Sequence, residues 1–420
     1  MRILLVNTFH YRRGGAEVHA LDLADQLRAA GHEVRFFAMH HPENIPSADS
    51  EYWAPEIDYP ALNARKTPAA AWRVLSSAIY SRPARSSIAR MLDDWKPDVA
   101  HLHNIHAHLT PSVIDELKSR GIPVVWTIHD YKLICPAQGF HIRGEICERC
   151  KGQRFWECAL HSCKRSRSAS LVATLEAEAH RFLHLPERVD AFIAPSDFVR
   201  RKFIDFGWPA DKFVHMANFA NVPIAPEVRA SKPGRVLFSG RLTRSKGVVT
   251  LVEAMRDLPD ARLDIAGEGT VREEILATTT APDWTGGEVN ATGWCDAASL
   301  STLIEDATVI AAPSEWYENS PYSVIEAFAH GRPVVATRIG GLPELVVDGV
   351  TGLVVEPRSP HELAAALKRI LDDPGLWRTL AEGALASAAS RNPADYVARL
   401  EGLYADVIAG RKPGGTSAAS

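Results

Sequence analysis

The sequence lacks any long uninterrupted apolar stretch, which argues against a helix that spans a bilayer. No apolar run approaches the ~20 residues that such a helix requires. The first residues, Met1–Asn7, hold an apolar core that is too short for a signal peptide and that predicts a buried strand instead. We therefore expect a cytoplasmic protein.

A strong net charge and the common nucleotide-binding fingerprints are also missing. The net charge of −4 on 420 residues does not indicate nucleic-acid binding. No Gly-x-Gly-x-x-Gly motif follows the first predicted strand and there is no Walker loop, so dinucleotide and ATP chemistry lose support. A hydrophobic content of 46% and a charged content of 23% are ordinary for a globular protein, and the length predicts two or three domains.

Short apolar strands alternate with amphipathic helices along the chain, which predicts an α/β fold with parallel sheets. The alternation stops near residues 221–233, where prolines interrupt it, and then resumes. We therefore expect two doubly wound domains, 1–222 and 235–392, joined by a linker at 223–234. Ligands bind at the carboxyl ends of parallel strands, so a site is expected in a cleft between the domains.

The last part of the chain predicts two further segments. Residues 393–410 predict a helix that can cross back and pack on the first domain. Residues 411–420 are rich in Gly, Ser and Ala, a composition that is typical of disordered tails.

Two carboxylates, Glu318 and Glu326, flank a predicted loop that turns into a helix. A carboxylate accepts two strong hydrogen bonds from neighbouring hydroxyls and carries no donor of its own. Between them, Asn319, Ser320 and Pro321 are residue types that begin helices, and the N–H groups at a helix start favour phosphate. The segment predicts one unit that holds sugar hydroxyls, ribose and phosphate. Two solvated glutamates beside an amphipathic helix are the alternative.

A basic loop follows a predicted strand over Arg235–Ser239. After Gly240, the cations of Arg241 and Lys246 would meet a diphosphate at the start of the next helix. Such a pair of cations stabilises a departing diphosphate without a metal ion. The alternative is a solvated basic loop, and Arg244 in the same loop is expected to face solvent.

Weaker signals lie at the ends of other predicted strands. Gly267 indicates a tight turn or the close approach of a ligand. The segment 291–295, which includes Trp294, is a candidate for contact with a nucleobase through its backbone. In the first half, Gly14 and Gly15 would let the backbone pass close to a ligand at the mouth of a helix, or would form a flexible turn.

Histidines gather at two predicted strand ends in the first half. His129 follows a strand over 124–128, so its imidazole is predicted to hydrogen-bond a sugar hydroxyl, with a purely structural histidine as the alternative. Four others lack the spacing of a zinc-binding helix and are expected on the acceptor side of the cleft: His101, His103, His106 and His108.

Five of the six cysteines cluster within a basic insert at about 135–167. Cys147-x2-Cys150 and Cys158-x4-Cys163 have the spacing of two halves of a structural zinc site, whereas free thiols or a disulfide are the alternatives. The Lys and Arg residues of the insert would suit an anionic lipid headgroup or a pyrophosphate-linked acceptor. The lipid contact would place the protein peripherally on the inner face of a membrane. A solvated loop is an equal interpretation.

Several motifs together resemble one family. Gly14-Gly15-Ala16-Glu17, His129-Asp130, Gly240-Arg241-x4-Lys246-Gly247 and Glu318-x7-Glu326 occur in this order, and Gly331-Arg332-Pro333 follows them. The set resembles the retaining GT-B glycosyltransferases of glycosyltransferase family four, over the chain up to about Ser390. The cysteine-rich insert resembles one in a subset of these enzymes. The resemblance implies a GT-B fold, in which an acceptor-side and a nucleotide-sugar-binding Rossmann-like domain face each other across a cleft.

The resemblance also implies an activity and its site. A hexose would pass from a UDP- or GDP-sugar to a hydroxyl of a saccharide, lipid-linked glycan or small-molecule acceptor, with retention at the anomeric carbon and without a cofactor. Arg241 and Lys246 would bind the diphosphate, and Glu326 the ribose. Glu318 would contact the donor sugar, and His129 the sugar near its reacting face. Other positions would line the phosphate or the donor, chiefly through their backbone: Gly14, Gly15, Asn319, Ser320 and Tyr322.

The implied mechanism is dissociative, because no Asp or Glu is clearly placed as a double-displacement nucleophile. The leaving diphosphate is stabilised electrostatically, and the acceptor hydroxyl attacks from the same face. Two alternatives remain open. A nucleotide-sugar epimerase of the same fold would turn over the donor without an acceptor, and a non-catalytic nucleotide-sugar-binding subunit would bind the donor without releasing nucleoside diphosphate.

Overall fold

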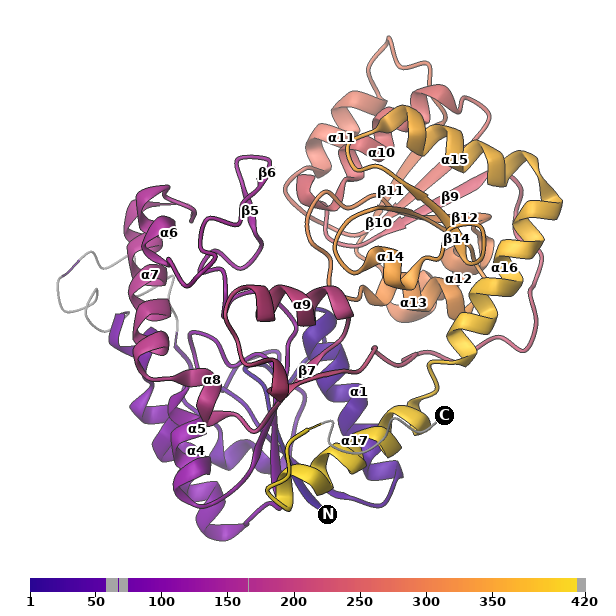
Figure 1. Cartoon of the computed structure of the whole chain (residues 1–420). Coiled ribbons are helices and arrows are strands. Elements are labelled where there is room, and N and C mark those ends of the chain that lie inside the picture. Colours follow the sequence, from indigo (N-terminus) through magenta and orange to yellow (C-terminus); the bar gives the residue numbers. More distant parts are fainter. Residues whose placement is uncertain (58–66, 68–74, 165, 414–420) are drawn as a thin grey trace. The chain divides into compact units, whose positions relative to one another are not determined.

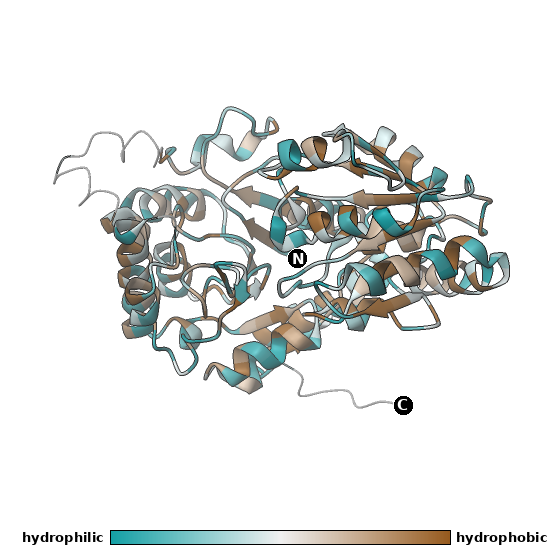
Figure 2. Ribbon diagram, turned by 90° about the horizontal axis from the view of Figure 1, so that it is seen from above, coloured by the Kyte–Doolittle hydropathy of each residue, from teal (hydrophilic) through white to brown (hydrophobic). Residues whose placement is uncertain are grey.

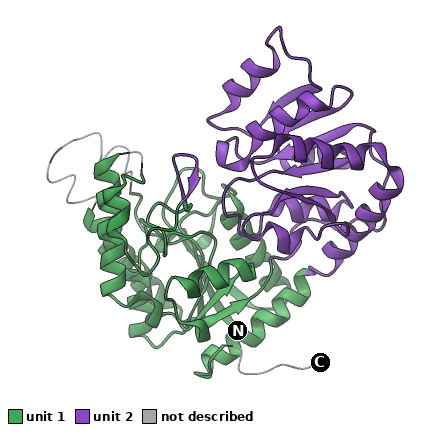
Figure 3. Cartoon of the chain, turned by 45° about the horizontal axis from the view of Figure 1, so that its top comes forward, with its two compact units in different colours: residues 1–140, 147–217, 393–420 green, residues 141–146, 218–392 purple. Residues whose placement is uncertain are grey.

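The structure is a computed structural model that describes residues 1–57, 67, 75–164 and 166–413 (Figure 1). The chain divides into two compact units, which Figure 3 distinguishes by colour. Unit 1 contains residues 1–140, 147–217 and 393–420, and unit 2 contains residues 141–146 and 218–392. Most of the predicted tail, residues 414–420, lies outside the described residues.

Unit 1 is built on a six-stranded sheet with the strand order β2-β1-β3-β4-β7-β8, and all neighbouring strands are parallel. The side chains of its central strands are buried, as expected for a parallel sheet covered on both faces. The strands are β1 (Arg2–Val6), β2 (Glu33–Phe37), β3 (Val99–Leu102), β4 (Val124–Thr127), β7 (Ala191–Ala194) and β8 (Phe213–His215). The helices of the unit include α1 (Gly15–Ala29), α4 (Arg82–Asp94), α5 (Ser112–Ser119), α6 (Trp156–Leu160), α7 (Arg167–Phe182), α8 (Leu185–Arg188), α9 (Asp197–Asp205) and α17 (Pro393–Ile408).

Unit 2 repeats this architecture with the order β11-β10-β9-β12-β13-β14, again all parallel. Strand β9 (Arg235–Ser239) shows how both faces are used, because Val236 and Phe238 join one apolar cluster and Leu237 joins the other. The remaining strands are β10 (Arg262–Ala266), β11 (Glu288–Gly293), β12 (Val309–Ala312), β13 (Val334–Thr337) and β14 (Gly352–Val355). The helices include α10 (Val248–Ala254), α11 (Arg272–Thr279), α12 (Ala297–Asp306), α13 (Tyr322–Ala329), α14 (Leu342–Leu345), α15 (Pro360–Asp372) and α16 (Pro374–Ala389).

Hydrophobic residues follow these sheets closely, and Figure 2 shows the strands of unit 2 mainly in the hydrophobic colours. The predicted α/β fold with two doubly wound parallel sheets is therefore confirmed. A small antiparallel hairpin, β5 (His141–Ile142) with β6 (Glu145–Ile146), lies within the predicted insert and groups with unit 2. None of the described helices is long and apolar enough to cross a bilayer.

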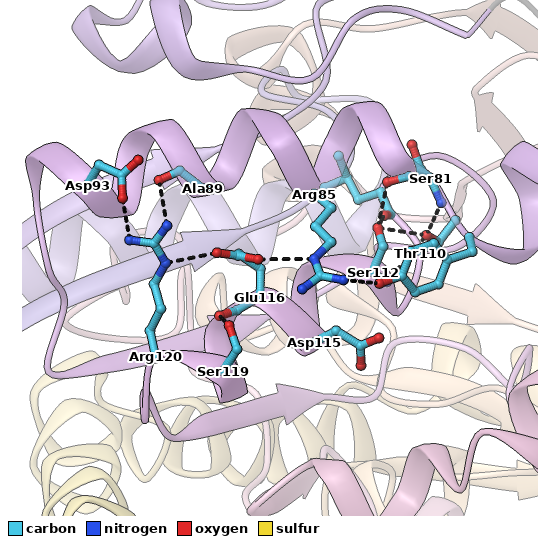
Figure 4. Close-up of polar contacts among 12 residues, drawn as sticks. Ser81, Arg85, Ala89, Asp93, Thr110, Ser112, Asp115, Glu116, Ser119 and Arg120 are labelled. Atoms are coloured by element: carbon cyan, nitrogen blue, oxygen red, sulfur yellow. Dashed lines mark hydrogen bonds and ion pairs between the residues drawn. The ribbon is translucent and has the colours of Figure 1, made fainter.

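A polar network ties α4 to α5 on unit 1 (Figure 4). The carboxylate of Glu116 accepts a hydrogen bond from Nε of Arg85 at 3.0 Å and another from Nε of Arg120 at 2.9 Å. Arg120 also pairs with Asp93 at 2.6 Å, so it bridges the two helices. Burial alone would raise the pKa of Glu116, but the two guanidinium groups hold it below the ordinary value.

The last helix, α17, belongs to unit 1. The hydroxyl of its Tyr404 lies 2.6 Å from Nδ1 of His101 on the central strand β3, and both residues are buried. Tyr396, about two turns earlier on the same helix, lies against His19 of α1. The helix therefore supplies part of the core of a unit whose sheet is formed by the beginning of the chain.

Candidate functional site

A pocket of about 390 Å³ lies within unit 2 at the carboxyl ends of β9 and β10. Arg241 is exposed there and forms no ion pair with any residue in the described part of the chain. Trp294, which follows β11, is 77% exposed beside the same pocket. Five of the predicted donor-binding positions thus come together in one pocket: Gly240, Arg241, Gly267, Trp294 and Glu326.

The two glycine-containing loops of this pocket pack backbone against backbone. Gly267 has φ +143°, and a Cβ atom on it would lie 2.0 Å from the carbonyl oxygen of Gly240. Only glycine fits this approach, because neither atom belongs to a side chain that can turn away. The close approach of the Gly240 backbone is therefore sufficient to explain the glycine at 267, without the ligand that the sequence also suggested.

Lys246 and Glu318 form a buried ion pair in the same unit. Nζ of Lys246 lies 2.6 Å from Oε1 of Glu318, with side chains that are 20% and 7% exposed. The same carboxylate oxygen accepts hydrogen bonds from the Ser314 hydroxyl at 2.6 Å and from the Trp316 indole N–H at 2.8 Å. Burial would raise the pKa of Glu318, but Lys246 and these donors hold it below the ordinary value, so the group is an anion.

A second glycine fixes the backbone of Glu318. Gly340 has φ +61°, and its Cβ position lies 2.4 Å from the carbonyl oxygen and 2.5 Å from the nitrogen of Glu318. The N–H of Gly341 then donates to the carbonyl of Glu318 at 2.8 Å. The Gly340-Gly341 pair therefore acts on the site through the backbone of the loop rather than through a ligand.

The loop after Glu318 leads into α13 differently from the sequence prediction. Pro321 occupies the N-cap position, and no side chain caps the helix, so the expectation that Asn319 or Ser320 is the cap is wrong. A proline at this position fixes the backbone but offers no side-chain acceptor. The Ser320 hydroxyl is buried and has no hydrogen-bond partner among the residues that the structure describes. Tyr322 is the first residue of the helix.

In unit 1, His129 belongs to a group of packed histidines. Its Nε2 lies 2.9 Å from Nδ1 of His103, with the rings stacked 5.2 Å apart. Burial holds the pKa of His19 and of His101 at about 3, and holds those of His103 and His129 well below the ordinary value. His129 itself is partly exposed and neutral, so it can offer a hydrogen bond without a charge.

The four histidines between 101 and 108 separate into two classes. His101 and His103 are fully buried core residues, so the expectation of an acceptor-side position is wrong for them. His101 lies on β3, which is central in the sheet, and His103 directly follows that strand, so both side chains are covered whatever their polarity. His106 and His108 line a second pocket of about 930 Å³, which lies within unit 1.

The unit 1 pocket contains charged residues that sequence analysis missed. Nζ of Lys132 pairs with Glu176 at 2.8 Å, and both side chains are buried. Lys164 lies nearby, and burial followed by the charge of Lys132 lowers its pKa. The sequence offered one sign that Lys132 belongs to a site, namely its place just after His129-Asp130 at the end of a predicted strand. Gly14 and Gly15 begin α1 next to two further lining residues, Arg13 and Glu17.

The cysteines of the insert lie near one another but do not form a metal centre. Burial, and then the nearby thiols Cys135, Cys158, Cys163 and Cys147, raises the pKa of Cys150. All are free thiols. Within the described ranges, no three His, Cys, Asp or Glu side chains come together as a group that could hold a metal ion. The arrangement does not fit zinc, and the zinc hypothesis for Cys147, Cys150, Cys158 and Cys163 gains no support.

Two family profiles match the chain in sequence. The profile described as Glycosyltransferase Family 4 matches residues 13–222, which is half of the chain. The profile described as Glycosyl transferases group 1 matches residues 233–373. The first match ends and the second begins at the predicted linker, and helices α16 and α17 lie outside both matches.

Known proteins are similar to this chain over nearly its whole length. D-inositol 3-phosphate glycosyltransferase 1 of Catenulispora acidiphila is 26% identical, over 94% of this chain and 92% of the relative. Among solved structures, Anabaena HepE in complex with UDP-glucose has a TM-score of 0.67 at 18% identity, covering 98% of this chain and 100% of the other. Sucrose-phosphate synthase of Thermosynechococcus elongatus has a TM-score of 0.69 at 20% identity, covering 98% and 100%. The structural likeness shows the GT-B fold.

Proposed function

Because the chain belongs to glycosyltransferase family 4, we propose that it transfers a hexose from a nucleoside diphosphate sugar to a hydroxyl acceptor, with retention at the anomeric carbon. The observation that carries this proposal is the unit 2 pocket, which joins Arg241, Glu326 and the exposed ring of Trp294. These are a cation for a diphosphate, a carboxylate for the two hydroxyls of a ribose, and an aromatic face for a nucleobase.

Each proposed role follows from the chemistry of the group. Arg241 binds the diphosphate as a bidentate donor. Its guanidinium group is exposed and forms no ion pair with a described residue, which suits a cation that binds an anionic ligand. Glu326 accepts hydrogen bonds from the ribose hydroxyls. The buried hydroxyl of Ser320 and the N–H groups at the start of α13 suit a phosphate oxygen. The base is uracil or guanine.

Lys246 and Glu318 act as a unit in this proposal. The ammonium of Lys246 neutralises charge as the diphosphate leaves, and the anionic Glu318 keeps that ammonium charged and in place. One oxygen of Glu318, Oε1, accepts hydrogen bonds from all three donors, Lys246, Ser314 and Trp316. The carboxylate is also the candidate contact to a hydroxyl of the donor sugar, as the resemblance implies.

The proposed reaction needs no covalent sugar–enzyme intermediate and no metal. The bond between the anomeric carbon and the diphosphate oxygen breaks, and the acceptor oxygen bonds to that carbon from the same face. The leaving phosphate oxygen takes the proton of the acceptor hydroxyl. His129, neutral at pH 7, donates a hydrogen bond to the sugar and does not act as a base.

A panel of nucleotide sugars tests the proposal in two steps. Thermal unfolding is measured with UDP- and GDP-sugars, since a ligand at 100 times its dissociation constant adds about 2.7 kcal/mol to stability. Release of nucleoside diphosphate is then followed with and without saccharide acceptors, and the anomeric configuration of the product is read by NMR. Donor binding without diphosphate release would indicate a binding subunit, and donor turnover to an isomeric sugar without acceptor would indicate an epimerase.

A further inference from the structure

Helices α6 and α7 of unit 1 turn large apolar side chains outward. On α7, Leu171, Leu175 and Phe182 are 51%, 40% and 71% exposed. On α6, Trp156 is 50% exposed and Leu160 is 69% exposed. The two helices pack against each other (Figure 1). We refer to these five residues as the α6–α7 surface.

The spacing places each set on one helical face. Trp156 and Leu160 are four residues apart, and Leu171, Leu175 and Phe182 follow one stripe of α7 at intervals of four and seven. The buried face of α7 instead carries small residues, among them Ser170, Ala173 and Ala177. A helix that only covers a core has the reverse pattern, with its large apolar residues inside and polar ones outside. The outward face of α7 is therefore built to contact something apolar.

The exposed charges between residues 149 and 182 are cations, and the exposed Glu187 of α8 shares a pocket with Phe182. Arg149, Lys151, Arg154, Arg167 and Arg181 are exposed on the segment that forms the two helices. The carboxylates between residues 149 and 182 are not exposed: Glu157 and Glu176 are buried, and half-buried Glu178 pairs with Arg181 at 2.7 Å. Exposed apolar residues flanked by exposed cations are the pattern of helices that lie in the headgroup layer of an anionic membrane.

We propose that the α6–α7 surface docks unit 1 on an anionic lipid bilayer, with the apolar side chains in the headgroup–acyl boundary and the basic residues on the headgroups. Tryptophan at such a boundary is favoured because its ring is amphipathic. The excess of exposed cations over exposed carboxylates favours an anionic bilayer over a protein partner without net charge. The proposal stands independently of the proposed transfer reaction.

Docking would also have a consequence for the large pocket of unit 1. Ala169, Val172, Ala173 and Glu176 of α7 line that pocket, so the helix is shared between pocket and bilayer. An acceptor with a lipid tail could then keep the tail in the membrane while its polar head enters the pocket.

Flotation of the full chain with vesicles tests the proposal. Vesicles of equal parts phosphatidylglycerol and phosphatidylcholine should carry the protein, whereas pure phosphatidylcholine vesicles should bind it at least about tenfold less, and added salt should weaken the binding. The triple variant Leu171→Gln, Leu175→Gln, Phe182→Gln should lose at least about tenfold in partition to the anionic vesicles, because it removes most of the apolar contact.

A matched variant changes three exposed apolar residues elsewhere: Val347→Gln, Val350→Gln and Ile408→Gln, at positions 47%, 50% and 44% exposed. It should float like the wild type. If the first triple variant does not fold, as judged by circular dichroism, Phe182→Gln alone replaces it.

Three results would overturn the proposal. The first is a wild type that binds neither kind of vesicle. The second is an α6–α7 variant that binds anionic vesicles as strongly as the matched variant does. The third is a wild type that light scattering shows to be a dimer and that binds no vesicles, together with an α6–α7 variant that is a monomer. This result would make the surface a contact between two copies of the chain.

Discussion

The ammonium of Lys246 lies 2.6 Å from the carboxylate of Glu318, 72 residues further along the chain. Both are among the residues that the sequence marks for the donor, yet the structure shows them bound to each other. Each therefore determines the state of the other: the cation keeps the acid ionised, and the acid keeps the cation charged and oriented.

Lys246→Ala should lower turnover by about 100-fold or more, because it removes a cation from the leaving group. It should also cost about 3 kcal/mol of stability, since it leaves a buried carboxylate without its charged partner. Arg244→Ala is the matched control, because Arg244 is an exposed cation of the same loop, paired with Glu274 at 2.6 Å. Rates of diphosphate release and urea unfolding of both variants provide the measurement. Full activity in Lys246→Ala would remove the diphosphate role.

Gly340→Ala should destabilise unit 2 and weaken nucleotide binding together. The new Cβ atom meets the backbone of Glu318 at 2.4 Å, so the loop must move. Gly349→Ala separates this clash from the cost of positive φ, because Gly349 has φ +73° and nothing within 4 Å of its Cβ position. The control should lose only about 1 kcal/mol, the ordinary cost of the left-handed conformation, and keep its nucleotide affinity. Equal effects of the two variants on binding would contradict the role of Gly340.

Stability should fall as the pH drops from 7 to 5. The pKa values of His19 and His101 are about 3 in the folded protein because of burial, against 6.5 for an unburied histidine. Between these values the unfolded chain binds more protons, so acid favours unfolding, by about 2 kcal/mol for each histidine over this interval. Urea unfolding at both pH values measures the effect. Equal stability at pH 7 and pH 5 would contradict this role of burial.

Cys150 and Cys163 of the insert should resist alkylation, because burial raises the pKa of both thiols. Burial raises the pKa of Cys163 to about 12, so the reactive thiolate is scarce at pH 8, and the reaction should be at least about 100-fold slower than in the unfolded chain. Adding a zinc chelator should not change the rate at Cys150 or Cys163, with Cys295 as the internal control. A chelator that accelerates alkylation, with zinc recovered by metal analysis, would restore the structural zinc hypothesis.

Much of the fold could be predicted because buried parallel strands are short apolar runs. β9 has the predicted bounds, Arg235–Ser239, and β4 ends one residue before the end of the predicted strand 124–128. β11 was missed as a strand, and its end was named only as a candidate for contact with a nucleobase, because its side chains are mostly part-exposed. β14, at the other edge of the same sheet, is mostly buried and so carries the clearer apolar signal.

The gathering of several motif residues in one pocket was predictable, but their pairings were not. Gly240, Arg241 and Glu326 line one pocket, since the first two follow the carboxyl end of β9 and Glu326 lies on α13. The pairing of Lys246 with Glu318 depends on how the Gly340 loop packs, which no local pattern reports. Lys132 and Glu176 were missed for the same reason, because their contact joins a loop to a helix 44 residues away.

Unit 1 contains Tyr404, a fully buried residue near the end of the chain. During synthesis, the core of unit 1 therefore stays incomplete until the final helix has been translated. The stretch 218–392 of unit 2 is translated before that helix and can fold earlier. A premature stop near residue 392 would accordingly harm the half of the protein that was translated first.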